Sequence, residues 1–116
     1  MLTRWNWNER RVEYLPEAQK DIRDLDGSQR ILVRKAIQKV SGNPLSNAEG
    51  GYGTPLGSKG GTNLTGFLKI KLKGICLRIV YKTIQTEDTM LIVIIGARAD
   101  DEVYEEANHR VKKHSL

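Results

Sequence analysis

Residues 67–98 read FLKIKLKGICLRIVYKTIQTEDTMLIVIIGAR, and this stretch decides the fold of the chain. KIKLK at 69–73 alternates lysines with apolar residues. Since successive side chains of a strand point to opposite faces, the lysines share one face and the apolar residues share the other. Gly74 ends this strand, CLRIVYKTI follows as a second strand, and QTEDT turns the chain into a third. The pattern predicts an antiparallel meander.

The third strand of the meander differs from the first. Leu91 to Ile95 are all apolar without alternation, so both faces of this strand should be covered, as in the centre of a sheet. The second strand begins beside Cys76, the only cysteine, which lies between Ile75 and Leu77. A lone cysteine excludes an internal disulfide, and its apolar neighbours predict a buried, inert thiol.

The residues before the meander predict a strand and a helical hairpin. Residues 10–15, RRVEYL, alternate as a short strand, and PEAQKDIRDL at 16–25 has a proline suited to the first turn of a helix. Gly27 is predicted to end this helix and Ser28 to cap a second one, which ends at SGNP. The second helix has an apolar stripe of Leu32, Val33, Ala36, Ile37 and Val40, and a solvated face with Arg30, Arg34, Lys35 and Lys39.

Two further segments complete the chain. Residues 41–66 are rich in Gly, Ser, Asn and Pro, have no sustained period and lack a phosphate-binding motif, which predicts a flexible connecting loop. Residues 100–111, DDEVYEEANHRV, begin with acidic residues and have apolar residues at fourfold spacing, namely Val103, Ala107 and Val111. Arg110, Lys112 and Lys113 follow at the basic end, and this charge order matches a helix dipole. The whole order predicts one α+β domain over residues 1–116, with the first strand and helical hairpin packed on a small, mainly antiparallel twisted sheet.

The composition limits the class of protein. A length of 116 residues with 39% hydrophobic and 28% charged residues is that of one globular domain. The formal net charge of +5 favours an anionic partner, either nucleic acid or an acidic protein. No apolar stretch is long enough to span a bilayer or to act as a secretion leader, so we expect a cytoplasmic protein without membrane contacts. His109 and His114 have no ligand-spaced partners and are predicted to face solvent, so neither a metal nor a cofactor is expected.

Positive charge is concentrated in the predicted sheet. Only Glu87 and Asp88, both in a turn, oppose it between residues 67 and 98. A row of lysines on a half-exposed strand is often a solvated face, and a surface that binds an anion is the alternative. The basic residues of this stretch are Lys69, Lys71, Lys73, Arg78, Lys82 and Arg98.

The spacing of these residues resembles the RelE family of toxin–antitoxin ribonucleases. That family has K-x-K on one strand, R-[LIV]-V-Y on the next, G-x-R after the third and then E-V-Y. The chain has the first motif at 69–71, the second at 78–81, the third at 96–98 and the fourth at 102–104. The resemblance extends from about Val12 to Val111 and is specific from Phe67 onward.

The resemblance implies the fold described above and a metal-independent endoribonuclease. Such an enzyme enters the A site of the small ribosomal subunit and cuts mRNA there by attack of a ribose 2′-hydroxyl on the adjacent phosphate. Lys69 and Lys71 would contact the scissile phosphate and help to activate the 2′-hydroxyl. Arg78 and Arg98 would balance the developing charge, with Arg98 near the leaving oxygen. Tyr104 would stack on a base or orient it.

The resemblance also implies a cognate antitoxin that covers the basic face. Lys73 and Lys82 are predicted to extend the contacts with RNA. Two residues apart on a strand, lysines are separated by about 7 Å, which suits flanking one phosphate. An ordinary lysine is neutral only about once in a few thousand molecules at pH 7, so the identity of the general base stays open and the electrostatic role is the prediction. Ala97 and Asp100 make this end of the sheet less positive than the family pattern, which affects substrate affinity and codon preference.

Two other functions fit parts of the pattern. A ParE-like protein of the same fold inhibits DNA gyrase without cutting nucleic acid, and the fold by itself does not separate it from a nuclease. A non-catalytic RNA-binding module should interleave exposed aromatic residues with the basic ones, which this lysine face does not do. The full set of cations together with Tyr104 favours the nuclease.

Overall fold

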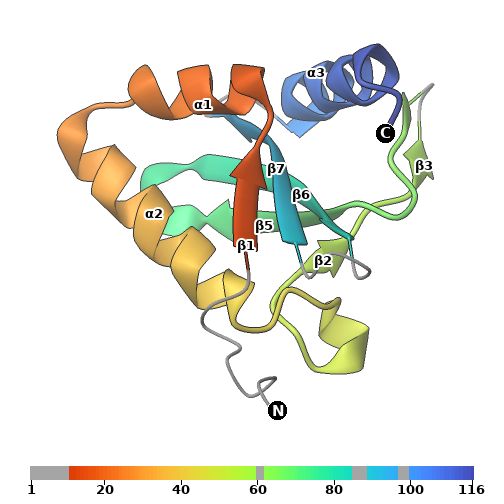
Figure 1. The fold of residues 1–116 in the computed structure, drawn as a ribbon, viewed down its shortest axis with the longest axis horizontal. Helices are drawn as coiled ribbons and strands as arrows, with labels where there is room; N and C mark the ends of the chain where they lie inside the picture. Colours follow the sequence, from red (N-terminus) through yellow and green to blue (C-terminus); the bar gives the residue numbers. More distant parts are fainter. Residues whose placement is uncertain (1–10, 60–61, 85–88, 97–99) are drawn as a thin grey trace.

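The computed structural model describes residues 11–59, 62–84, 89–96 and 100–116, and Figure 1 shows helices packed on a twisted sheet. No helix in these ranges is long and apolar enough to cross a membrane. The predicted turn at 85–88 lies outside them. The helices are α1 (Pro16–Arg23), α2 (Gly27–Ser41) and α3 (Asp100–Lys113), with 3-10 turns η2 (Asn47–Glu49) and η3 (Lys73–Ile75). The strands are β1 (Arg11–Tyr14), β2 (Thr54–Pro55), β3 (Ser58–Lys59), β4 (Thr62–Asn63), β5 (Leu68–Leu72), β6 (Leu77–Ile84) and β7 (Thr89–Gly96).

The main sheet has the strand order β1-β7-β6-β5-β2. β1 runs parallel to β7, whereas β5, β6 and β7 form the predicted antiparallel meander. The prediction that the third strand is central is confirmed, because β7 lies between β1 and β6 and its residues from Thr89 to Ile95 are all buried. The predicted α+β architecture is therefore the observed one.

The junction between α1 and α2 differs from the prediction. α1 ends at Arg23, and the cap of α2 is Asp26 rather than Ser28. The Asp26 carboxylate accepts a 2.8 Å hydrogen bond from the Gln29 N–H, and the Gln29 side chain accepts one from the Asp26 N–H at 3.4 Å. This reciprocal pair forms a capping box, which places Gly27 inside α2 instead of after α1. The hydrogen bonds from Gln29 and Ser28 also lower the pKa of Asp26.

The apolar and charged faces of α2 were predicted only in part. Val33, Ile37 and Val40 enter the core, but Leu32 is exposed, since it lies a residue too early for the buried stripe. Arg30 does not lie on a solvated face. Its guanidinium donates hydrogen bonds to the carbonyl oxygens of Ile22, Arg23 and Leu25, at 3.3, 3.2 and 2.8 Å, and so supplies donors to the end of α1.

The segment predicted as a connecting loop, residues 41–66, contains regular elements. β2 adds to the edge of the main sheet beside β5, and β3 pairs with β4 as a separate small hairpin. The buried Tyr81 side chain holds the start of this segment against β6, because its hydroxyl donates a 2.8 Å hydrogen bond to the Pro44 carbonyl oxygen. Burial raises the pKa of Tyr81 above its usual value, so the hydroxyl keeps its proton.

Gly53 lies close against the sheet. A Cβ added there would overlap the Tyr81 hydroxyl and come within 2.9 Å of a Leu68 methyl group. We therefore expect Gly53→Ala to lower the free energy of unfolding by about 1–3 kcal/mol, measured by urea denaturation. Gly57→Ala is the matched control, because no atom lies within 4 Å of its added Cβ. Equal effects of the two substitutions would contradict this account.

α3 confirms the predicted C-terminal helix and lies beside α1 (Figure 1). Val103 and Ala107 are fully buried at the predicted fourfold spacing. His114 differs from its prediction as a solvent-facing residue. It is half-buried, and its Nε2 lies 3.0 Å from a carboxylate oxygen of Glu17 in α1. The end of α3 is thus tied to the first helix of the hairpin.

Candidate functional site

The register between β5 and β6 collects the predicted basic residues on one face of the sheet. Lys71 lies directly opposite Arg78, and Lys69 lies opposite Val80. Directly opposed residues of an antiparallel pair point to the same side, as do residues two apart on one strand. By this alternation Lys82 also joins them. We call Lys69, Lys71, Arg78 and Lys82 the cation face.

Burial differs along the cation face. Lys71 is exposed, whereas Lys69, Arg78 and Lys82 are half-buried, and Val80 between them is fully buried. The other side of the same strands carries Ile79 and Tyr81, which are buried in the core. Cations held on a partly desolvated surface act on an anion more strongly than cations in bulk water. The geometry therefore suits the binding of a phosphodiester.

Two aromatic rings accompany the cation face. The Lys69 Nζ lies 5.5 Å from the centre of the Tyr104 ring, and the Lys82 Nζ lies 5.3 Å from that of Phe67. α3 thus brings Tyr104 to Lys69 of β5. The Tyr104 hydroxyl is shielded from solvent and has no hydrogen-bond partner among the described residues. A tyrosine that only packed at a helix start would usually keep its hydroxyl in water.

The connection between β5 and β6 corrects the prediction for Cys76. The side chain is exposed rather than buried. Its backbone has a φ of 55°, a left-handed conformation that ends η3 and turns the chain into β6. The Cys76 carbonyl oxygen accepts a 3.5 Å hydrogen bond from Arg78 Nη1, so the turn helps to orient this arginine.

The structure leaves two predicted site residues without a described position. Arg98 lies outside the described residues, and so does the side chain of Lys73, whose backbone belongs to η3. In the sequence, Arg98 comes two residues after Gly96, and Gly96 pairs with Arg78 between β6 and β7. The roles of Arg98 and Lys73 stay predictions from the sequence.

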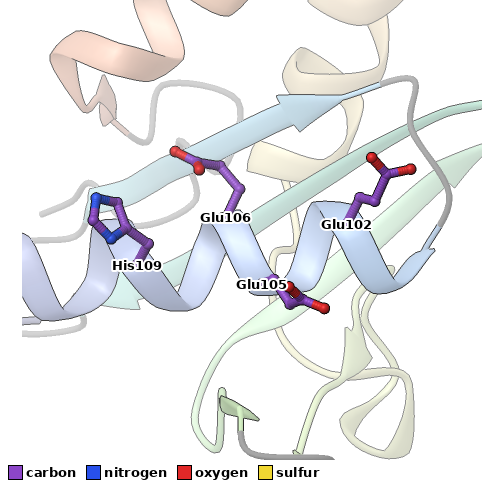
Figure 2. Close-up of a pocket in the computed structure, with 4 residues that line it drawn as sticks. All are labelled: Glu102, Glu105, Glu106 and His109. Atoms are coloured by element: carbon purple, nitrogen blue, oxygen red, sulfur yellow. The ribbon is translucent and has the colours of Figure 1, made fainter.

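The outer side of α3 carries acidic residues, in contrast to the basic cation face. Figure 2 shows Glu102, Glu105, Glu106 and His109 around a shallow pocket of 390 Å³. Carboxylates repel phosphate, so an RNA strand on the cation face would not extend over this side of α3. Within the described ranges, no cluster of His, Cys, Asp or Glu side chains is arranged to hold a metal ion.

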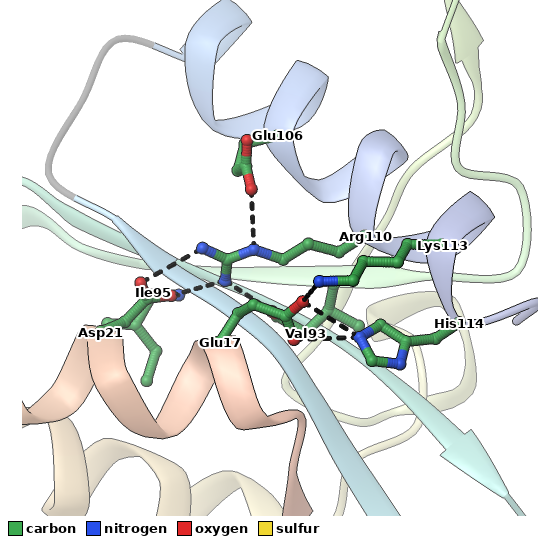
Figure 3. Close-up of polar contacts among 8 residues, drawn as sticks. All are labelled: Glu17, Asp21, Val93, Ile95, Glu106, Arg110, Lys113 and His114. Atoms are coloured by element: carbon green, nitrogen blue, oxygen red, sulfur yellow. Dashed lines mark hydrogen bonds and ion pairs between the residues drawn. The ribbon is translucent and has the colours of Figure 1, made fainter.

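Sequence reasoning missed the polar contacts that hold α3 against α1. Arg110 was predicted as a basic residue suited to the end of a helix, but it is buried and paired with Asp21. Glu17 accepts a 2.9 Å hydrogen bond from Lys113 Nζ and also contacts His114 (Figure 3). The pairs are separated by 89 residues or more, and no local pattern marks them.

The Glu17 contacts predict an acid-sensitive end of α3. The Lys113 ammonium, aided by the Glu17 backbone and His114, lowers the pKa of Glu17 from 4.5 to about 2. A lowered pKa stabilises the folded state above pH 4.5, and this contribution is lost as the pH falls toward 2. Since Lys113 is largely exposed, we expect a loss of about 1 kcal/mol, measured by thermal unfolding between pH 5 and about pH 2. Glu17→Gln should remove this part of the pH dependence, and an unchanged profile would contradict the assignment.

Solved structures of RelE toxins resemble this chain. A mutant of E. coli RelE in the free state matches with a TM-score of 0.67 and 24% identity, over 88% of this chain and 97% of that chain. Another RelE structure, in complex with a peptide of the antitoxin RelB, matches with a TM-score of 0.62 and 25% identity over 84% and 92%. A toxin–antitoxin complex from Mycobacterium tuberculosis matches with a TM-score of 0.52 and 24% identity over 78% and 93%. No protein-family profile and no curated protein sequence matches the chain.

The structural comparison confirms the predicted fold. The chain spans nearly the whole of the RelE structures and has a RelE-like α+β fold. At a sequence identity of 24–25%, the similarity shows a shared fold and does not by itself show a shared activity. The chemistry of the site depends on the residues of the cation face.

Proposed function

We propose that this protein is the toxin of a type II toxin–antitoxin system and a metal-independent endoribonuclease that cuts mRNA in the ribosomal A site. The observation that carries the proposal is the β5–β6 register, which places Lys69, Lys71 and Arg78 on one face with Tyr104 beside them. The RelE-like fold supports it, because the RelE structures that match the chain are those of a toxin.

The cation face suits the charge changes of the proposed reaction. Attack of a 2′-hydroxyl on the adjacent phosphate gathers negative charge on the phosphoryl oxygens and on the leaving 5′-oxygen. Cations held in place by a sheet stabilise that charge without having to reorganise during the reaction. Arg78 remains charged throughout, so it acts as an electrostatic group. Lys69 and Lys71 flank the phosphate, and either could also exchange a proton with the 2′-hydroxyl.

Tyr104 supplies the aromatic group of the proposed site. Its ring lies against the Lys69 ammonium, and its hydroxyl is turned away from solvent. An exposed base of mRNA stacks readily on such a ring. Stacking would fix the nucleotide next to the scissile phosphate, which leaves the cations to act on the phosphate itself.

An antitoxin is the proposed protein partner. RelE has been solved with a peptide of its antitoxin RelB, and the Mycobacterium tuberculosis neighbour is a toxin–antitoxin complex. A net charge of +5 with a concentrated cation face favours an acidic partner segment. Covering this face would block access of RNA, so binding and inhibition would be one event.

Primer extension on a translated message tests the proposal. Purified protein is added to ribosome–mRNA complexes, to the same mRNA alone, and to complexes with EDTA. The amount of EDTA removes transition metals but leaves the magnesium that keeps the ribosomes assembled. We expect cuts within codons only when ribosomes are present, and no loss of cutting from the chelator. Products should carry a free 5′-hydroxyl, shown by labelling with polynucleotide kinase without prior phosphatase treatment.

The gyrase-inhibitor function gives a different result in parallel assays. Intact messages together with failed DNA supercoiling by gyrase would replace the nuclease proposal with the ParE-like one. Binding to RNA without either effect would indicate an RNA-binding module. Salt-sensitive binding to polyanions is common to all three and separates none of them.

A further inference from the structure

A buried ion pair joins α1, β7 and α3 in one contact. The Arg110 guanidinium donates two hydrogen bonds to the Asp21 carboxylate, from Nη1 at 2.7 Å and from Nη2 at 3.3 Å (Figure 3). It also donates from Nε to Glu106, one turn earlier on α3, at 3.0 Å. The two partners are mostly buried, with side-chain exposures of 10% for Arg110 and 19% for Asp21. A buried arginine with both ends paired holds its helix in one register.

The same two residues complete the edge of β7. β1 pairs with β7 only as far as Ile92, whose carbonyl oxygen accepts the last hydrogen bond from Leu15. Beyond that point the Val93 carbonyl oxygen accepts from Arg110 Nη1, and the Ile95 N–H donates to Asp21, both at 3.0 Å. Side chains thus replace a strand along the end of β7 and satisfy its buried backbone groups.

The end of β7 and α3 supply separate parts of the proposed site. Gly96, next to Ile95, lies opposite Arg78 of the cation face. α3 also packs closely against Gly96, since an added Cβ would lie 3.1 Å from a Val103 methyl group. Tyr104 follows on α3 and contacts Lys69. Asp21 hydrogen-bonds to α3 through Arg110 and to β7 through the Ile95 N–H, so it links the helix that carries Tyr104 to the strand end beside Arg78.

We propose that Asp21 is a positioning residue of the RNA-cleavage site, acting through Arg110 and the Ile95 N–H to hold Tyr104 beside Lys69. This inference rests on the proposed function and deepens it. Asp21 lies on α1 and bonds to the helix and the strand end, whereas RNA would lie on the cation face. Its effect on cleavage is therefore exerted through geometry.

Asp21→Asn tests the inference in single-turnover cleavage on ribosome–mRNA complexes. Asparagine keeps the size of the side chain but loses the charge and one of the two acceptor oxygens. We expect the cleavage rate at saturating ribosome concentration to fall about tenfold, because a small displacement of an orienting group slows a positioned reaction. The ribosome concentration for half-maximal rate should change less than about twofold, since the surface that would meet the ribosome is unaltered.

Glu17→Gln is the matched control. It lies one turn earlier on α1 and removes the carboxylate that pairs with Lys113 and His114 at the far end of α3. Its cleavage rate should change less than about twofold. If both variants lost activity in proportion to their loss of folded protein, measured by circular dichroism at the assay temperature, Asp21 would be a structural residue only and the inference would be overturned.

A double substitution separates positioning from other effects. If Asp21 acts by placing Tyr104, then adding Asp21→Asn to a Tyr104→Ala variant should cost less than about twofold more. If the rate loss of the double variant equalled the product of the two single losses, the inference would be contradicted.

An NMR measurement tests the positioning without the reaction. If the wild-type protein cut no message, the proposed function would fail, and nuclear Overhauser contacts between the Tyr104 ring and the Lys69 side chain would decide the positioning. Those contacts should weaken in Asp21→Asn and persist in Glu17→Gln, and their persistence in both would overturn it.

Discussion

Lys71→Ala is expected to reduce ribosome-dependent cleavage about 10²-fold or more, the usual cost of removing one group that stabilises developing charge. Lys71 is exposed and lies directly opposite Arg78, so two cations of the cation face meet there. As a surface substitution it should change the free energy of unfolding by no more than about 0.5 kcal/mol. The cleavage rate is measured by primer extension over time, and the stability by urea denaturation.

Lys35→Ala provides the matched control for Lys71→Ala. It removes the same charge from an exposed position on α2, away from the cation face, so cleavage should stay close to that of the wild type. If Lys35→Ala were as damaging as Lys71→Ala, the effect would belong to net charge rather than to the site. Lys71→Arg adds a further distinction. It keeps the charge but cannot act as a base at neutral pH, so retained activity assigns Lys71 an electrostatic role.

Asp21→Ala is expected to destabilise the protein by about 3 kcal/mol, because it leaves the Arg110 guanidinium buried without its main counterion. Burial alone would lower the pKa of Arg110, but Asp21 and Glu106 outweigh burial and raise it. The charge therefore persists in the folded protein at any ordinary pH. Removing Asp21 also leaves the Ile95 N–H without its acceptor. The loss is measured by urea denaturation at neutral pH.

The double variant Asp21→Leu/Arg110→Met tests the cause of that loss. Apolar side chains of similar size remove both buried charges, so this variant should be more stable than Asp21→Ala. A double variant as unstable as Asp21→Ala, or less stable, would show that the backbone hydrogen bonds of Val93 and Ile95 matter more than the buried charge. The comparison separates the cost of an unpaired charge from that of an open strand edge.

Local patterns were sufficient for most of the regular elements. The alternation in β5, the unbroken apolar run in β7 and the acidic-to-basic order of α3 each depend on residues close in the chain, and each was predicted correctly. The predictions failed where two local signals competed. Asp26 rather than Ser28 caps α2, because the aspartate has Gln29 at the position that completes a capping box. Cys76 is exposed and lies at a turn with positive φ, which its apolar neighbours do not reveal.

The sequence by itself determined the side of the sheet on which Lys69 and Lys71 stand, because the twofold alternation of a strand is a property of the backbone. Only the tertiary structure decided that Arg78 lies opposite Lys71, that Tyr104 reaches Lys69, and that Asp21 meets Arg110. Register and helix docking depend on contacts between distant parts of the chain. Such contacts follow from how the whole core packs, and no short stretch of residues specifies them.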